Sequence, residues 1–493
     1  MLLKSSAMKS PEYLLEFEIE EARRLGYEIV DRMVAYQQRL PELPVLQIGG
    51  MEHLGAALKE PMPAGPNDPM NILDRIESEI VSRTNHETHP RFFAFIPGPS
   101  NFAAALAEFL RAGYNFFAGS WLEGSGPAMV ELTTLNWVRQ LAGYPETAQG
   151  TFLSGGSLAN LSAIVTARDH LLKREDYSRA VIYGSDQTHL SIDRALRILG
   201  FGKDQLRRLS SHDSYCLQIG ELEECIAKDR RAGLQPFCVI ANAGTTNTGA
   251  IDPLSEMADL CAREKLWLHA DGAFGASAIF SAKGRKLLSG LERTDSFSLD
   301  PHKWLFQPFD CGILIVREGA HLRHAFQVRE DEAEYLQDAR NVKGEINLWD
   351  YSPELTRPFR ALKVWMTLQI FGARAVEAAI DRTLELAEIA EQAIKSLPDW
   401  EIVTPAQMAI LTFRYAPVNL RGGTHGARLD VMNRAIAGKM QQDAFALVLT
   451  TELKGSTVLR MCTINPRTTV EDVEKTVAAL QKSAEKVLSS TAS

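Results

Sequence analysis

The stretch Ser296-Phe297-Ser298-Leu299-Asp300-Pro301-His302-Lys303-Trp304 decides how this chain is interpreted, because it places Lys303 in an apolar setting. A strand-like run at residues 311–316 follows closely. Burial disfavours an ammonium group and lowers the pKa of a lysine, and a neutral lysine can attack a carbonyl carbon to form a Schiff base. The alternative is a partly buried lysine that pairs with Asp300 or Asp310. The rest of the chain has to distinguish the two.

Composition narrows the class of protein. The chain has 493 residues, 45% of them hydrophobic, which predicts two or three domains. A net charge of -9 with dispersed Lys and Arg argues against binding of nucleic acid. The six cysteines form no CxxC motif and no metal-ligand spacing, which predicts no metal site and fits a reducing cytoplasm. No signal peptide and no apolar run of ~20 residues is present, so we expect a cytoplasmic protein without membrane contact.

The sequence of residues 1–86 predicts an N-terminal helical arm. Residues 12–39 have apolar side chains at helical spacing, whereas residues 41–69 are rich in Pro and Gly and predict a segment with little regular structure. The apolar stripe of such a helix needs a partner surface. Either a second subunit or the chain's own large domain could supply it.

Strand-like and helical patterns alternate from about residue 87. This alternation predicts an α/β domain with a mainly parallel sheet, in which ligands bind beyond the carboxyl ends of the strands. The expected strands are residues 151–153, 180–183, 237–241, 266–270, 296–299 and 312–316, and the expected helices are 158–172, 191–199, 221–231 and 253–264.

The C-terminal third follows a different pattern. Residues 327–357 are charged and weakly periodic, which indicates either a functional, mobile loop over about 328–350 or a solvated surface helix with a loop. An α+β domain then follows a long helix that begins near residue 359. Its expected elements are strands at 400–403, 410–414 and 458–462, a flexible glycine loop at 422–426 and a closing helix at 470–487. We therefore expect three parts: residues 1–86, 87–371 and 372–493.

A glycine-rich turn at residues 152–160 joins a predicted strand to a predicted helix. Gly156 lets the backbone approach an anion, and Ser157 adds a hydroxyl at the start of the helix, where free N–H groups favour a phosphate. The turn lacks the lysine of a Walker A loop and the three-glycine dinucleotide fingerprint. The alternative is a plain turn with a serine cap.

Three further polar groups follow predicted strands. Asp271 can pair with a protonated ring nitrogen, or cap a helix. His189 can stack on a planar cofactor, or simply form hydrogen bonds near a helix start. The hydroxyl-rich turn at 243–249 can donate to a carboxylate or a phenolic oxygen, although such turns are common. An anion cradle, a ring-nitrogen partner, a stacking ring and a Schiff-base lysine together indicate pyridoxal 5'-phosphate (PLP).

These motifs carry a resemblance to a known family over nearly the whole chain. Residues 300–304, 269–274, 155–157, His189, 357–363 and 89–94 resemble the group II PLP-dependent amino acid decarboxylases, in the style of aromatic-L-amino-acid decarboxylase. The resemblance implies a large α/β domain of the aspartate aminotransferase type, a small C-terminal domain and an N-terminal arm that completes a homodimer with sites at the subunit interface.

The resemblance also implies residue roles. Lys303 would carry the cofactor as a Schiff base, Asp271 would keep the ring nitrogen protonated, and His189 would stack on one ring face. The remaining cofactor contacts would come from Gly156, Ser157, Thr246, Ala273, Asp300 and His302. The substrate pocket would contain Phe93, Phe95, Ile96, Trp121, Leu348 and Trp349.

Three departures from the family pattern bear on function. Asp300 stands where the family often has an asparagine, and a carboxylate is unfavourable beside a phosphate. Leu348 occupies the position at which animal members have a tyrosine that protonates the substrate carbon. Residues 95–99 are less aromatic than in members that act on aromatic substrates. The expected reaction is decarboxylation of an L-amino acid, aromatic by resemblance, to an amine. Aldehyde-forming deamination or transamination and a weakly catalytic binding protein are the alternatives.

Overall fold

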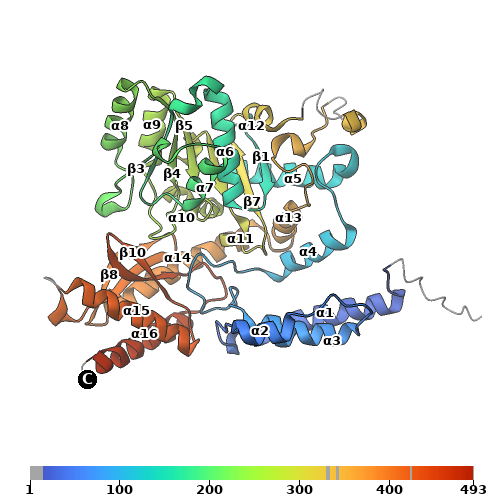
Figure 1. The fold of residues 1–493 in the computed structure, drawn as a ribbon, viewed down its shortest axis with the longest axis vertical. Coiled ribbons are helices and arrows are strands. Elements are labelled where there is room, and N and C mark those ends of the chain that lie inside the picture. The colour runs from blue at the N-terminus through green and yellow to red at the C-terminus, as the bar shows by residue number, and fades with distance from the viewer. Residues whose placement is uncertain (1–14, 329–333, 340–343, 422–424, 492–493) are drawn as a thin grey trace, which may run out of the picture.

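A seven-stranded sheet forms the centre of the molecule (Figure 1). The computed structural model describes residues 15–328, 334–339, 344–421 and 425–491. The strand order is β1-β7-β6-β5-β4-β2-β3, and among the described strands of this sheet only β7 runs in the direction opposite to the others. The strands are β1 (Gln149–Leu153), β2 (Ala180–Ser185), β3 (Leu206–Leu209), β4 (Gln235–Asn242), β5 (Trp267–Asp271), β6 (Ser296–Leu299) and β7 (Gly312–Val316).

The prediction of a mainly parallel α/β sheet is confirmed, with one strand missed. All six expected strands are present, and the structure also contains β3 at the edge of the sheet, which was not predicted. The expected helices are also present. The helices of this part are α4 (Phe102–Tyr114), α5 (Trp121–Leu141), α6 (Gly156–Leu171), α7 (Leu190–Ile198), α8 (Ile219–Arg231), α9 (Leu254–Glu264), α10 (Ala282–Leu287), α11 (Pro301–Trp304), α12 (Gly319–Phe326) and α13 (Ala361–Phe371).

A second, four-stranded antiparallel sheet lies beside the first, at the lower left of Figure 1. Its order is β10-β11-β9-β8, and it packs with three helices around its own apolar cluster. The sequence predicted three of these strands and the closing helix but not β10 or α15. The elements are α14 (Ala373–Lys395), β8 (Trp400–Gln407), β9 (Ile410–Tyr415), α15 (Gly426–Asp443), β10 (Leu449–Leu453), β11 (Ser456–Cys462) and α16 (Val470–Thr491).

The N-terminal helices project from the two sheets at the lower right of Figure 1. The expected long helix is α1 (Ile19–Arg39), and within it only Leu25 is buried. The prediction that residues 41–69 lack regular structure is wrong in part, because α2 (Met51–Leu58) lies within them, between the Pro- and Gly-rich flanks. α3 (Pro69–Arg75) starts behind the capping carboxylate of Asp68.

Two expected loops fall partly outside the described residues. Residues 329–333, 340–343 and 422–424 are not described, so the mobility of the 328–350 loop and the flexibility of the glycine loop stay predictions. Of the described part of the first loop, the short 3-10 helix Leu348–Tyr351 buries Leu348 and Trp349. None of the described helices combines the length and the apolar character needed to cross a bilayer.

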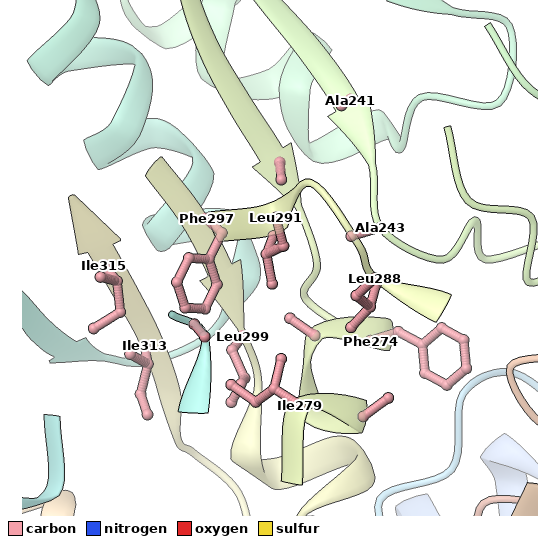
Figure 2. Packing of buried hydrophobic residues seen from close by; sticks show 14 of the residues in the cluster. Ala241, Ala243, Phe274, Ile279, Leu288, Leu291, Phe297, Leu299, Ile313 and Ile315 are labelled. Carbon is pink, nitrogen blue, oxygen red and sulfur yellow. The ribbon is translucent and has the colours of Figure 1, made fainter. Parts of the chain in front are cut away.

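The sheet face near β6 and β7 is held by apolar pairs. Phe297 and Leu299 of β6 lie opposite Ile315 and Ile313 of β7, and all four are buried (Figure 2). Phe274, which follows β5, packs its ring on Trp304 with centroids 5.1 Å apart. The residues on both sides of Lys303 are thereby fixed to the core, which positions the lysine.

A buried ion pair joins three segments beneath the glycine-rich turn. The Arg357 guanidinium donates to Glu131 at 2.5 Å, and the two side chains are 1% and 0% exposed. Arg357 also donates to the carbonyl of Phe152, whose N–H donates to Glu131. The pair therefore ties α5 and the residues before α13 to the end of β1.

We expect Arg357→Ala to lower the free energy of unfolding by about 3–5 kcal/mol, because it leaves the buried Glu131 carboxylate without its cation. Chemical denaturation measures this change. Arg263→Ala is the matched control: its pair with Glu223 is more than half exposed on both sides, so we expect a loss of about 0–1 kcal/mol. Equal losses in the two variants would contradict the stabilising role of the buried pair.

Candidate active site

The carboxyl ends of five parallel strands converge on one edge of the large sheet. β1, β2, β4, β5 and β6 all point the same way, since β1 and β6 both run antiparallel to β7. The predicted site residues follow these strands directly. Two adjoining cavities of about 270 Å³ and about 30 Å³ lie there, and His189, Ala273 and Lys303 line both.

The glycine-rich turn presents backbone N–H groups to the larger cavity. α6 begins at Gly156, and no side chain caps its N-terminus. A Cβ on Gly156 would lie 2.6 Å from Cβ of Ala273, so only glycine fits there. Ser157 lines the same cavity. Uncapped N–H groups at the start of a helix this long favour an anion, which is the environment that a phosphate group needs.

Lys303 reaches the same cavity from α11. Its Nζ lies 2.8 Å from Oδ2 of Asp300, so the ion pair that the sequence offered as an alternative is present. The side chain of Lys303 is 24% exposed, whereas that of Asp300 is 2% exposed. The lysine is therefore held by a buried carboxylate with its amine open to the cavity.

His302 lies beside Lys303 with its proton directed to the cavity side. Its Nδ1 accepts the N–H of Cys311 at 3.0 Å. Burial lowers the pKa of His302, opposed by the charge of Asp300, so the neutral ring carries its proton on Nε2. Nε2 lies 3.6 Å from Asp300 and is a donor available to an anion.

His189 lines both cavities at the start of α7. It is also the helix cap that the alternative interpretation predicted, because its Nδ1 accepts the N–H of Ser191 at 3.2 Å. The two roles are compatible, since the residue that caps the helix also lines both cavities.

Asp271 is a buried carboxylate at the end of β5, only 7% exposed. It accepts hydrogen bonds from Nδ2 of Asn160 at 2.9 Å, from Ser298 at 3.3 Å and from the N–H of Ala273 at 3.2 Å. Among the residues that the structure describes, none forms an ion pair with Asp271. A ligand with a protonated ring nitrogen would supply the missing positive charge.

A chain of hydrogen bonds orients Asn160 toward Asp271. His269 Nε2 lies 3.0 Å from Oδ1 of Asn160, and its Nδ1 lies 2.9 Å from Oγ of Ser296. Burial lowers the pKa of His269 to about 4, although the nearby Asp271 charge acts in the opposite sense, so the ring is neutral. A neutral ring that donates to Oδ1 leaves the amide N–H₂ of Asn160 facing the carboxylate.

No role was predicted for Asn160, Ser298 or Ser191, whose side chains form hydrogen bonds with the site residues. The signal for Asn160 was its position one helical turn after Gly156, on the same helix face. His269 and Asp271 are two apart in a strand and so share a face. Their partners lie far away in the sequence, so contacts between them could not be predicted from spacing.

The predicted cofactor residues converge, whereas the predicted pocket residues do not line these cavities. Gly156, Ser157, His189, Ala273, Asp300, His302 and Lys303 line the larger cavity, and Thr246 and Asp271 line the smaller one. Among the described residues around the two cavities, none belongs to the predicted substrate pocket, whose members are Phe93, Phe95, Ile96, Trp121, Leu348 and Trp349.

Packing explains the position of several predicted pocket residues. Phe93 is fully buried in the core of the four-stranded sheet, and its N–H donates to Leu447. Phe95 is 60% exposed and points outward. The N–H of Trp121 donates to Asn347, and the ring of Trp349 meets that of Phe117 edge-on.

The residues around the cavities fit PLP. An uncapped helix start with Ser157 and His302 offers donors for a phosphate, Asp271 offers a carboxylate that lacks a cation, and Lys303 offers an amine. These are the three functional groups that the cofactor requires of a protein.

Solved structures have the same architecture. Oryza sativa TDC with PLP and tryptamine matches with a TM-score of 0.89 at 27% identity, covering 95% of this chain and 99% of that one. Rhodiola rosea 4-hydroxyphenylacetaldehyde synthase matches with a TM-score of 0.87 at 24% identity, over 95% of this chain and 99% of its own, and supports the fold alone. The large sheet is therefore that of a fold-type I PLP-dependent enzyme, as predicted.

Sequence comparisons narrow this class to a family. The family model described as pyridoxal-dependent decarboxylase conserved domain matches residues 52–416. The aromatic-L-amino-acid decarboxylase of Bacillus atrophaeus is 43% identical over 474 residues, covering 96% of this chain and 97% of that protein. The phenylacetaldehyde synthase of Arabidopsis thaliana is 30% identical over 491 residues, covering 97% and 99%. The chain belongs to the group II pyridoxal-dependent decarboxylase family, and it is a carboxy-lyase that uses PLP.

We expect Asn160→Asp to weaken PLP binding by at least about tenfold, or about 1.4 kcal/mol, because it places a second carboxylate against Asp271. Asn160→Ala is the control, since it removes the hydrogen bond without adding charge, and its loss should be smaller. Titration of the cofactor-free protein with PLP measures both constants. An aspartate variant that binds as tightly as the alanine variant would contradict the proposed environment of Asp271.

Proposed function

We propose that this enzyme decarboxylates an aromatic L-amino acid to the corresponding amine. The observation that carries the proposal is the convergence of Lys303 and Asp271 on adjoining cavities with the glycine-rich turn. The 43% identity to an aromatic-L-amino-acid decarboxylase over almost the whole chain supports the aromatic substrate.

Each site residue has a proposed task. Lys303 bonds the cofactor through its amine, and Asp271 holds the proton of the ring nitrogen. His189 and Ala273 enclose the ring, Thr246 faces the substrate side, and the phosphate is bound by Gly156, Ser157 and His302.

PLP, when bound, supplies an electron sink for the bond that releases carbon dioxide. The protein's contribution is positional and electrostatic. The buried Asp271 carboxylate favours the protonated ring nitrogen, since a charge pair is strong in a site closed to water. Because the side chain of Lys303 is partly exposed to the cavity, the amine of a substrate can approach it.

Aldehyde formation is the second candidate, and one position favours it. Leu348 carries no titratable proton and is 1% exposed, so it cannot serve as the acid that the resemblance places there. Phenylacetaldehyde synthases of Arabidopsis thaliana and Petunia hybrida are among the proteins of similar sequence, each 30% identical. A weakly catalytic binding protein is the third candidate, and the intact set of Lys303, Asp271 and His189 argues against it.

We also propose a cytoplasmic homodimer in which residues 1–86 form the contact arm, 87–371 the cofactor domain and 372–493 the small domain. α1 exposes Ile19 by 75% and Tyr27 by 66%, which is costly for a helix without a partner. A groove of about 820 Å³ between α1 and the α3 region exposes mainly apolar surface, and we propose that it binds the arm of the second subunit. All six cysteines are free thiols, which fits a reducing compartment.

We expect aromatic L-amino acids to give carbon dioxide and amine in equal amounts when incubated with enzyme and PLP. Quantifying carbon dioxide, amine, aldehyde and peroxide together measures the partition. Lys303→Ala is the control, and it should lose both turnover and the visible absorbance of the covalently bound cofactor. Aldehyde with peroxide would replace the first candidate by the second, and a normal cofactor spectrum without turnover on any amino acid would favour the third.

A further inference from the structure

Asp300 is the acidic group beside the proposed phosphate position. It follows β6 directly, and its backbone N–H donates to the carbonyl of Ala273 at 2.9 Å. Its Oδ2 receives the Lys303 ammonium at 2.8 Å. Its Oδ1 is buried and has no hydrogen-bond partner among the described residues. One half of this carboxyl group is therefore satisfied and the other half is open.

Both oxygens of Asp300 lie close to the glycine-rich turn. A Cβ on Gly156 would lie 2.9 Å from Oδ2 of Asp300, and a Cβ on Gly155 would lie 3.9 Å from Oδ1. The other groups proposed to hold the phosphate are donors: backbone N–H groups, the Ser157 hydroxyl and Nε2 of His302. Asp300 is the group in this set that repels a phosphate when it is ionised.

The repulsion becomes acute when the cofactor bonds to the lysine. Among the described residues, Lys303 forms the shortest ion pair with Asp300, at 2.8 Å, and its nitrogen is the atom that is proposed to bond the cofactor. We propose that Asp300 takes up one proton from solvent when PLP binds, and that the resulting carboxylic acid donates this proton in a hydrogen bond to the cofactor phosphate. Asp300 then acts as the amide of an asparagine would, at the cost of a bound proton.

The other titratable groups described near the proposed phosphate position do not account for the uptake of this proton. Burial lowers the pKa of His302, which therefore stays neutral. Burial raises the pKa of the Cys311 thiol to about 12, and the charge of Asp300 adds to the effect, so the thiol stays protonated. His189 lines the same cavity from α7, and Asp271 faces the adjoining one. The charges of Lys363 and Asp310 act on the pKa of His302 in opposite directions, Lys363 lowering it and Asp310 raising it.

The inference rests on the proposed position of the phosphate and does not depend on whether an amine or an aldehyde is released. Pyridoxine 5'-phosphate tests the phosphate position separately from the proton uptake by Asp300. It has the phosphate but no aldehyde, so it cannot bond to Lys303 and leaves the Lys303 ammonium beside Asp300. A pH-indicator dye in weakly buffered solution at about pH 8 counts the protons taken up by the cofactor-free full-length protein.

We expect the wild type to take up about one proton per subunit more with PLP than with pyridoxine 5'-phosphate, and Asp300→Asn to show no such difference. The apparent Kd of the wild type for PLP should accordingly rise up to about tenfold more per pH unit than that of Asp300→Asn. Asp310→Asn is the matched control, with the same loss of charge nearby, and should behave as the wild type. Asp300→Ser, also a neutral donor, repeats the test if the asparagine variant is unstable.

Equal proton uptake by wild type and Asp300→Asn would overturn the role of Asp300 while leaving the phosphate position intact. A loss of uptake in Asp310→Asn as well would overturn the assignment to Asp300. Failure of wild-type protein to bind pyridoxine 5'-phosphate would overturn the proposed phosphate position and this inference together.

Discussion

A carboxylate buried without a cation is the constraint on which the site depends. Asp271 is 7% exposed, and its hydrogen bonds come from Asn160, Ser298 and a backbone N–H, all of them uncharged. Burying an unpaired charge costs several kcal/mol, so the fold maintains an electrostatic deficit at this point. A ligand that brings a positive ring nitrogen removes the deficit. We therefore propose that the Asp271 carboxylate contributes to the binding of a pyridinium cofactor.

Strand direction makes this arrangement possible. In the sheet, β7 lies between β6 and β1 and runs antiparallel to both. The carboxyl end of β1 therefore lies at the same edge of the sheet as the carboxyl ends of β5 and β6. The uncapped start of α6, the Asp271 carboxylate and Lys303 therefore lie close together, although more than a hundred residues separate the first from the last. The buried pair of Arg357 and Glu131 fixes the end of β1 from below, so the glycine-rich turn has a rigid base.

Much of this could be predicted from the sequence, because apolar strands followed by polar residues are a local signal. β3 was missed since it carries Arg207 and Arg208 at a sheet edge, and α2 was missed since Pro and Gly dominate its flanks. The support given to Asp271 by Asn160 was not predictable from spacing, because it depends on a contact between distant segments. Leu348 is the opposite case. The sequence alone shows that this position carries no acidic group, whereas the product of the reaction has to be measured.

The most direct test of the account is an experimental structure of the enzyme with PLP bound. We predict continuous density from Nζ of Lys303 to the cofactor, the ring nitrogen within hydrogen-bond distance of Asp271, and the phosphate against Ser157, His302 and the start of α6. A cofactor whose ring nitrogen faces away from Asp271, or whose phosphate lies outside the glycine-rich turn, would contradict it.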